Sequence, residues 1–211
     1  MQEKLDDLSQ SDPMLGKFIE IIGPLELKKQ NDLYLSLVKS IIGQQLSVKA
    51  AATIFSRFVV LTNSLVSPEI VLMLSDEALR GIGISYQKIR YIKDLSQKVL
   101  EKEIELETLN ALSNDEVIST LTKVKGIGTW TAEMFLIFSL GREDVLSLAD
   151  VGLQRGVKWL YNADDGKKAL IEKGEHWSPY RSLASLYLWE AVNLGFVMKY
   201  KSFNEYHFIN H

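Results

Sequence analysis

The chain has 211 residues, of which 46% are hydrophobic and 24% are charged, a composition typical of a soluble globular protein with one domain or two small lobes. It contains no cysteine, which excludes disulfides, thiolate zinc sites and cysteine-ligated iron–sulfur clusters. The formal net charge of −3 excludes strong nucleic-acid binding through global charge, so any such binding must depend on a local basic surface and on backbone N–H groups.

The sequence carries no signal for membrane insertion or secretion. No apolar run approaches the length of a membrane span, and the N-terminal segment MQEKLDDLSQ is polar. We therefore expect a protein without membrane association, located in the cytoplasm or nucleoid, or in the nucleus if the source is eukaryotic.

Apolar spacing and capping residues predict helices along most of the chain. Residues 1–30 are expected to hold one or two short helices, and residues 142–149 a loop. Asp165-Gly166 is expected to end a helical region, and the aromatic tail 199–211 to be partly ordered. The predicted segments are 14–22 after Asp12-Pro13, 32–43, 47–61, three helix starts at Ser67, Ser75 and Ser85, 113–124, 129–140, 151–161 and 178–198.

The predicted fold is all-α, because no convincing strand or βαβ unit appears. We expect a single domain over residues 1–211 that is built from two helical lobes. One lobe would cover 31–135, and the other would combine 1–30 with 136–211. The hairpin described next would then lie at the cleft between the lobes, where binding sites tend to form.

The most specific pattern is the turn Gly126-Ile127-Gly128, which separates two predicted helices. Two glycines one residue apart can both take positive φ and leave backbone N–H groups uncovered. The helix that starts at Thr129 adds its own unpaired N–H groups and a positive dipole end, a combination that binds phosphate. Lys123 and Lys125 flank the turn and either supply local positive charge or are solvated surface residues.

The spacing of apolar residues around this turn fits two packed helices. Leu121 and Val124 lie on one face of the first helix, and Ala132 and Phe135 lie on one face of the second. The segment therefore resembles a helix-hairpin-helix motif. Because Asp150 follows about twenty residues later, it is similar to the helix-hairpin-helix DNA glycosylase superfamily. Within this superfamily, GIGTWTA and LADVGLQRG resemble the alkylbase (3-methyladenine) DNA glycosylase II branch, and the resemblance extends over about residues 12–195.

Asp150 has two interpretations. An aspartate ahead of a helix is ordinarily an N-cap. In the resembling family, however, the matching residue is catalytic. A carboxylate near C1′ would stabilise the positive charge that develops on the sugar as the N-glycosidic bond breaks, and it would orient or deprotonate the attacking water.

The resemblance also implies the reaction class and a base pocket. Bifunctional members carry a lysine at the position of Trp130, so the chain is expected to be a monofunctional glycosylase that leaves an abasic site. Tryptophan faces attract cationic bases such as 3-methyladenine and 7-methylguanine. Trp130 and Met134 share one helical face, so an alternative interpretation is that both are ordinary core residues. The implied pocket residues are Trp130, Met134, Trp189 and Val151, of which Met134 and Val151 occupy positions that are often aromatic in the family.

The remaining expectations concern DNA contacts. An enzyme that extracts a base must fill the hole that the base leaves, and IIGQQLSVKAA resembles the family segment that carries this wedge. The wedge residue is expected to be Gln45, with Leu46 as the second choice, although both also fit a bland surface loop. The implied DNA-contacting residues are Gly126, Ile127, Gly128, Thr129, Thr131, Lys123 and Lys125.

No cofactor is expected to be required. The family holds a structural Na⁺ or K⁺ on hairpin carbonyls, and Thr122, Val124 and Ile127 match those positions. The expected partner is double-stranded DNA with alkylated bases, bound by a monomer. Two other interpretations remain at this stage, a non-catalytic helix-hairpin-helix DNA-binding module and an all-α scaffold.

Overall fold

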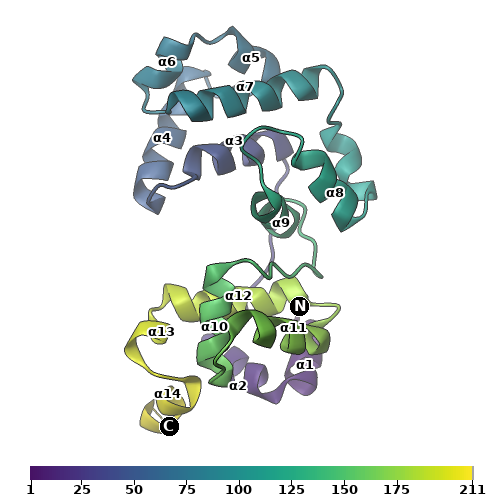
Figure 1. Cartoon of the computed structure of the whole chain (residues 1–211), viewed down its shortest axis with the longest axis vertical. Coiled ribbons are helices and arrows are strands. Elements are labelled where there is room, and N and C mark those ends of the chain that lie inside the picture. Colours follow the sequence, from purple (N-terminus) through teal and green to yellow (C-terminus); the bar gives the residue numbers. More distant parts are fainter. Residues whose placement is uncertain (211) are drawn as a thin grey trace. The chain divides into compact units, whose positions relative to one another are not determined.

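A computed structural model of the chain describes residues 1–210, and every regular element within that range is a helix (Figure 1). This confirms the predicted all-α class. The chain divides into two compact units, which are described separately. The hairpin unit is Lys29–Leu140, and the terminal unit combines Met1–Lys28 with the chain from Gly141 onward. None of the helices in residues 1–210 is long and apolar enough to cross a membrane.

The hairpin unit is held together by helices whose starts are set by short polar side chains. At the start of five of these helices, a serine hydroxyl accepts a hydrogen bond from a backbone N–H group. The Asp32 carboxylate does the same for the helix that begins at Leu33. The helices are α3 (Leu33–Gly43), α4 (Val48–Leu61), α5 (Pro68–Met73), α6 (Asp76–Gly81), α7 (Tyr86–Leu100), η1 (Leu106–Ala111), α8 (Asn114–Leu121) and α9 (Thr129–Phe138).

The core of the hairpin unit lies between α3 and α7, with α5 packed along α7 (Figure 1). Leu37 and Ile41 of α3 and Ile89 and Ile92 of α7 are fully buried. Both pairs have the helical spacing that the sequence predicts, so one apolar stripe on each helix faces the core. Another stripe of α7, which carries Lys88, Tyr91 and Asp94, contacts the loop after α3 and the turn after α8.

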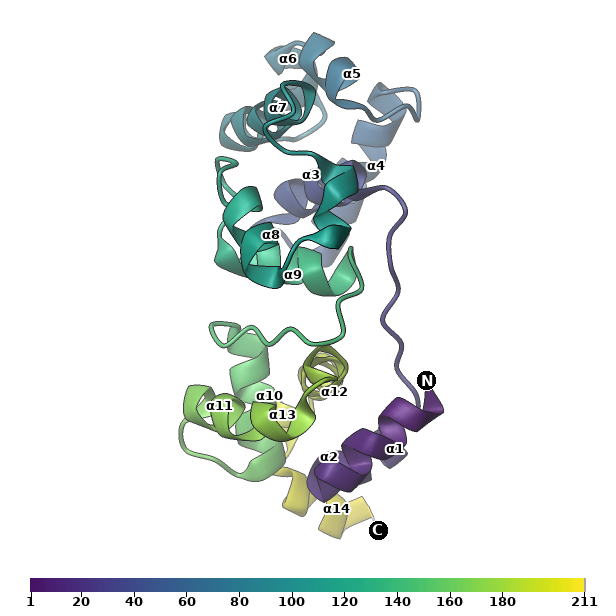
Figure 2. The ribbon, with the colours of Figure 1, turned by 90° about the vertical axis from the view of Figure 1, so that its right-hand side faces the viewer.

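The terminal unit packs α10, α11 and α12 on the α1–α2 pair, as both ribbon views show (Figure 2). Phe18, Trp177 and Tyr187 are its largest fully buried side chains, together with Phe203 from the tail. The helices are α1 (Gln2–Ser11), α2 (Pro13–Ile22), α10 (Val151–Tyr161), α11 (Gly166–Trp177), α12 (Arg181–Asn193), α13 (Phe196–Lys199) and α14 (Phe203–Asn210).

Two sequence-based boundaries in the terminal unit are wrong. Asp165-Gly166 starts α11 rather than ending a region, because the Asp165 carboxylate accepts a hydrogen bond from the Lys168 N–H at 3.0 Å. Gly166 is required there by close packing, since a Cβ at this position would lie 2.6 Å from the Gln154 carbonyl oxygen. The predicted helix 178–198 is also divided, because Gly195 takes φ +73° between α12 and α13.

Asp12 joins three helices of the terminal unit at one buried carboxylate. Its Oδ1 caps α2 by accepting the Leu15 N–H at 3.1 Å, and its Oδ2 accepts the Tyr161 hydroxyl at 2.7 Å and the Trp177 Nε1–H at 3.0 Å. Burial, together with the Asp12 charge, raises the pKa of Tyr161, so this hydroxyl stays protonated and donates. The predicted N-cap is therefore also a link from α2 to α10 and α11.

The Asp12→Ala variant is expected to lower the free energy of unfolding by about 3 kcal/mol, because it leaves two buried donors and one helix start without their acceptor. The matched control is Asp165→Ala, which removes an exposed cap from α11 and should cost about 1 kcal/mol. Urea denaturation followed by circular dichroism measures both. Equal losses in the two variants would show that the buried bonds add nothing to the cap.

Candidate functional site

The α8–α9 turn has the predicted hairpin packing, with only one of its two glycines at positive φ. Gly126 takes φ +83°, whereas Gly128 is extended at φ −95° and forms the N-cap of α9. Of the two glycines that can adopt positive φ, only Gly126 does so in the structure. A single left-handed residue is enough to reverse the chain, because the following extended residue leads directly into the helix.

The two glycines are needed for different reasons. A Cβ on Gly126 would lie 2.0 Å from a ring carbon of Tyr91, so the turn lies directly against this ring on α7. A Cβ on Gly128 would have no heavy atom within 4 Å. Gly126 is thus required by the packing of the protein itself, while Gly128 leaves an open approach to the backbone at the start of α9.

The backbone N–H groups of the hairpin divide into engaged and open donors. The Ile127 N–H donates to the Val124 carbonyl at 3.1 Å, and the Lys125 N–H donates to the Asp94 carboxylate at 2.9 Å. Within residues 1–210, the N–H groups of Gly126, Gly128 and Thr129 have no protein acceptor. Together with the positive end of α9, these three donors form a surface suited to an anion.

These contacts revise the predicted DNA-contacting set. Ile127 is only 4% exposed and its N–H is engaged, so neither its side chain nor its amide is open to a phosphate. Thr131 is buried at 6% exposure, which limits its side chain as a contact. Lys123 is exposed, and the Lys125 ammonium lies 3.3 Å from Asp94 with 73% of its side chain exposed.

The loop after α3, residues 44–47 and called the wedge loop below, places the two candidate wedge residues at the surface. Gln45 is exposed and takes φ +57°, a conformation that non-glycine residues adopt at a cost of about 1–3 kcal/mol. Leu46 is 39% exposed, and Val48 follows at 89%. The neighbouring Gln44 donates from its side-chain Nε2 to the Gly126 carbonyl at 2.8 Å, which joins this loop to the hairpin turn.

Trp130 and Met134 both lie on α9 and line different cavities of the hairpin unit. Trp130 is 48% exposed, so it is not a core residue. It lines a polar cavity of about 300 Å³ with residues of the wedge loop and α7. Met134 lines an apolar cavity of about 560 Å³ with Leu46 of the wedge loop and Phe138 of α9.

Asp150 is the N-cap of α10 in the terminal unit, and its carboxylate has a second hydrogen-bond donor. Its Oδ1 accepts the Leu153 N–H at 2.7 Å, as an N-cap does, and also the Trp189 Nε1–H at 3.0 Å. Trp189 was predicted from sequence as a base-stacking face. The structure shows that its indole edge also orients the carboxylate. Val151, the other predicted pocket residue of this unit, follows directly and is 58% exposed.

Two glycines that sequence reasoning missed allow this contact. A Cβ on Gly152 would lie 3.0 Å from Asp150 Oδ1 and 3.1 Å from Trp189 Cδ1. A Cβ on Gly156 would lie 2.5 Å from the Leu188 carbonyl oxygen. Both positions fall on the side of α10 that faces α12, and their spacing of four residues is the available sequence signal for such a close helix crossing.

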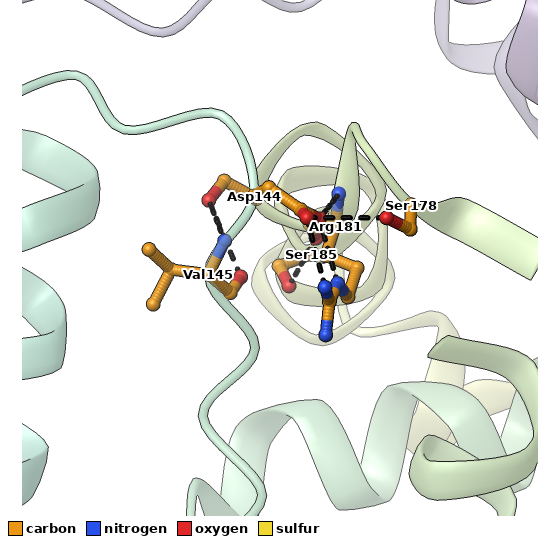
Figure 3. Close-up of polar contacts among 6 residues, drawn as sticks. Asp144, Val145, Ser178, Arg181 and Ser185 are labelled. Carbon is orange, nitrogen blue, oxygen red and sulfur yellow. Dashed lines mark hydrogen bonds and ion pairs between the residues drawn. The ribbon is translucent and has the colours of Figure 1, made fainter. Parts of the chain in front are cut away.

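The segment before Asp150 is anchored to the start of α12 (Figure 3). The Arg181 guanidinium donates to both Asp144 carboxylate oxygens, at 2.6 and 2.8 Å, and the Ser182 hydroxyl accepts the Val145 N–H at 2.9 Å. The Arg181 hydrogen bonds lower the pKa of Asp144, and the same contact raises the pKa of Arg181. The predicted loop 142–149 is thereby fixed to the helix that carries Trp189.

Comparison with known proteins identifies relatives over most of the chain. Residues 38–179 match the model of the HhH-GPD superfamily of base excision DNA repair proteins. The chain is 33% identical to DNA-3-methyladenine glycosylase 1 of Schizosaccharomyces pombe, over 89% of this chain and 86% of that protein. It is 32% identical to a putative DNA-3-methyladenine glycosylase of Bacillus subtilis, over 91% of this chain and 69% of the other.

Two solved structures are similar over nearly the whole chain. A DNA-3-methyladenine glycosidase from Bacillus halodurans has a TM-score of 0.88 and 45% identity, covering 99% of this chain and 96% of the other. The Schizosaccharomyces pombe 3-methyladenine DNA glycosylase Mag1, in complex with abasic DNA, has a TM-score of 0.80 and 32% identity, covering 90% and 97%.

The different settings of the two hairpin glycines predict different stabilities. Gly126→Ala should lower the free energy of unfolding by about 2–4 kcal/mol, because it combines backbone strain with a clash against Tyr91. Gly128→Ala should cost less than about 1 kcal/mol, because the added methyl group meets no atom. Urea denaturation compares the two variants, and a larger loss in Gly128→Ala would contradict the described turn.

Proposed function

The chain belongs to the HhH-GPD superfamily of base excision DNA repair proteins, and we propose that it is a monofunctional DNA glycosylase acting on alkylated purines such as 3-methyladenine and 7-methylguanine. The proposed reaction extrudes the base from double-stranded DNA and hydrolyses its N-glycosidic bond, leaving an abasic site. The observation that carries the proposal is the position of the Asp150 carboxylate, which accepts hydrogen bonds from one backbone N–H and one indole N–H. It lies in a chain of a DNA-repair superfamily whose named relatives are DNA-3-methyladenine glycosylases.

The hairpin supplies the proposed grip on the DNA backbone. A phosphate at the start of α9 would accept from the open N–H groups of Gly126, Gly128 and Thr129, and the helix dipole would favour its charge. This mode of binding depends on directed amide donors and a few lysines, so it is compatible with a net charge of −3.

Asp150 would act on the sugar of the extruded nucleotide. Breaking the bond between base and sugar develops positive charge on the deoxyribose, as in glycoside hydrolysis. A fixed carboxylate near C1′ stabilises this charge more effectively than mobile solvent does, because its orientation is already set. The same group can orient the attacking water or take its proton.

The aromatic and apolar residues near the hairpin favour a cationic purine. Trp130 offers a half-exposed ring face, and an alkylated base that carries positive charge would gain about 0.5–2 kcal/mol on such a face. Met134 and Phe138 line the larger cavity with a polarisable thioether and an aromatic ring. A charged base is already a good leaving group, so this chemistry requires no general acid to protonate it.

We further propose that the enzyme works as a monomer and requires no cofactor. Its proposed location is the cytoplasm or nucleoid, or the nucleus if the source is eukaryotic. A structural Na⁺ or K⁺ would be held by the carbonyl oxygens of Thr122, Val124 and Ile127. The Val124 carbonyl accepts the Ile127 N–H and retains a second lone pair, which fits this role. Such an ion would add fixed positive charge beside the proposed phosphate.

The wild-type protein is expected to release 3-methyladenine from alkylated duplex DNA, and Asp150→Asn is expected to lower that rate by about a hundredfold or more. Asparagine caps helices as well as aspartate, and its oxygen can still accept the Leu153 and Trp189 donors, so the fold should be kept. Single-turnover base release, measured by chromatography of the freed base, gives the rate.

The matched control for this variant is Asp165→Asn, an exposed N-cap of α11 in the same unit, which should release base at the wild-type rate. DNA affinity should be unchanged in both variants. A wild-type protein that binds DNA and releases no alkylated base would instead indicate a non-catalytic DNA-binding module.

The purified protein should form no borohydride-trapped adduct with DNA and should not cleave the strand at the abasic product. A lysine nucleophile is needed for a Schiff base, and the position where bifunctional relatives carry it is occupied by Trp130. Gel electrophoresis after sodium borohydride treatment detects such adducts. A covalent adduct in the wild-type protein would show that another amine acts and that the monofunctional assignment is wrong.

A further inference from the structure

One face of α7 contacts both the wedge loop and the hairpin turn of the hairpin unit. Lys88, Tyr91 and Asp94 follow one another at helical spacing on this face. The Tyr91 ring covers Gly126, and the Asp94 carboxylate accepts the Lys125 N–H. The turn that presents the proposed phosphate donors is therefore supported from behind by α7.

Lys88 fixes the other end of the same face to the wedge loop. Its Nζ donates to the Ile42 carbonyl at 2.7 Å and to the Gln44 carbonyl at 2.6 Å. These carbonyls lie at the C-terminal end of α3, where the helix dipole favours a cation. Burial lowers the pKa of Lys88, and the ammonium faces two carbonyl oxygens. Both of these Lys88 contacts are made within the protein and hold the loop after α3.

Gln44 completes the connection between loop and hairpin. Its main-chain carbonyl is held by Lys88, while its side-chain Nε2 donates to the Gly126 carbonyl at 2.8 Å. The next residue, Gln45, takes φ +57° and is exposed. A strained residue persists only where its surroundings fix the backbone, and the two bonds at Gln44 provide that support.

We propose that Lys88 and Gln44 are positioning residues that fix the Gln45–Leu46 wedge relative to the phosphate-binding hairpin. The inference rests on the proposed function, since it assumes that the hairpin grips DNA and that the loop fills the gap left by an extruded base. In this arrangement the wedge is already ordered before DNA binds. A loop that is not held in the free protein would lose conformational entropy when DNA binds. This cost would weaken the complex with distorted DNA specifically, because the wedge is inserted only there.

Lys88→Met tests the proposal, because it keeps the aliphatic chain and removes the ammonium. The measurement is the ratio of two dissociation constants at fixed salt, for an undamaged duplex and for the same duplex with a tetrahydrofuran abasic-site analogue. We expect the preference of Lys88→Met for the abasic duplex to fall about tenfold, with affinity for undamaged DNA changed less than about twofold.

Three further variants separate positioning from general structural damage. Lys88→Arg should keep the preference, because a guanidinium can donate to both carbonyls. Lys98→Met is the matched control on α7, where Lys98 pairs with exposed Glu103 at 3.0 Å, and it should behave as wild type. Gln44→Ala removes only the bond to Gly126 and should also lose the preference, which keeps the test valid if Lys88→Met does not fold.

An unchanged preference in folded Lys88→Met and Gln44→Ala overturns the proposal, as does an equal loss of affinity for both duplexes. A wild-type protein without any preference for the abasic duplex also overturns it. The glycosylase activity is judged separately by release of 3-methyladenine from the wild-type protein. Absent base release together with a selective loss in Lys88→Met would refute the proposed function and support the positioning role.

Discussion

The proposed chemistry of this protein depends on one carboxylate oxygen, Oδ1 of Asp150, which accepts hydrogen bonds from the first turn of α10 and from Trp189 on α12. An N-cap alone would fix the start of α10 and leave the side chain tied to one helix. The indole bond adds a second helix. The close crossing at Gly152 and Gly156 brings this helix near enough for the indole to reach the carboxylate. The packing of α10 on α12 therefore contributes to the position of the acid, in addition to its N-cap bond.

The hairpin explains how an acidic chain could bind the phosphate that we propose at this turn. Asp94 occupies one backbone amide and pairs with Lys125, so it reduces both the number of open donors and the free positive charge. The donors that remain, at Gly126, Gly128 and Thr129, lie within one short turn. Directed amides fix where a phosphate sits, whereas lysines attract phosphates from any direction. We infer that the turn favours precise placement over strong nonspecific affinity.

Local signals in the sequence predicted most helix starts correctly, because a serine or aspartate that caps a helix acts within three residues of its own position. The same signals misplaced α11, since Asp165-Gly166 fits either a helix end or a capped start. Only the contact between Gly166 and α10 decides which one forms. The bond from Trp189 to Asp150 and the Lys88 contacts join residues 39 and more positions apart. No local pattern encodes such pairs, so these contacts were found only in the structure, although the sequence had already singled out Trp189 as a pocket residue.

The division of the chain separates the two tasks that we propose. The hairpin, the wedge loop and α7 belong to one unit, so the spacing between the proposed phosphate site and the proposed wedge is set by contacts within that unit. Asp150 and Trp189 belong to the other unit, where α10 and α12 set the orientation of the acid. Changes to the α7 face should then alter how DNA is held and distorted, and changes around Asp150 should alter the rate of bond cleavage. Because the contacts of the two sets share no residue, their effects on the free energy of the reaction should be nearly additive.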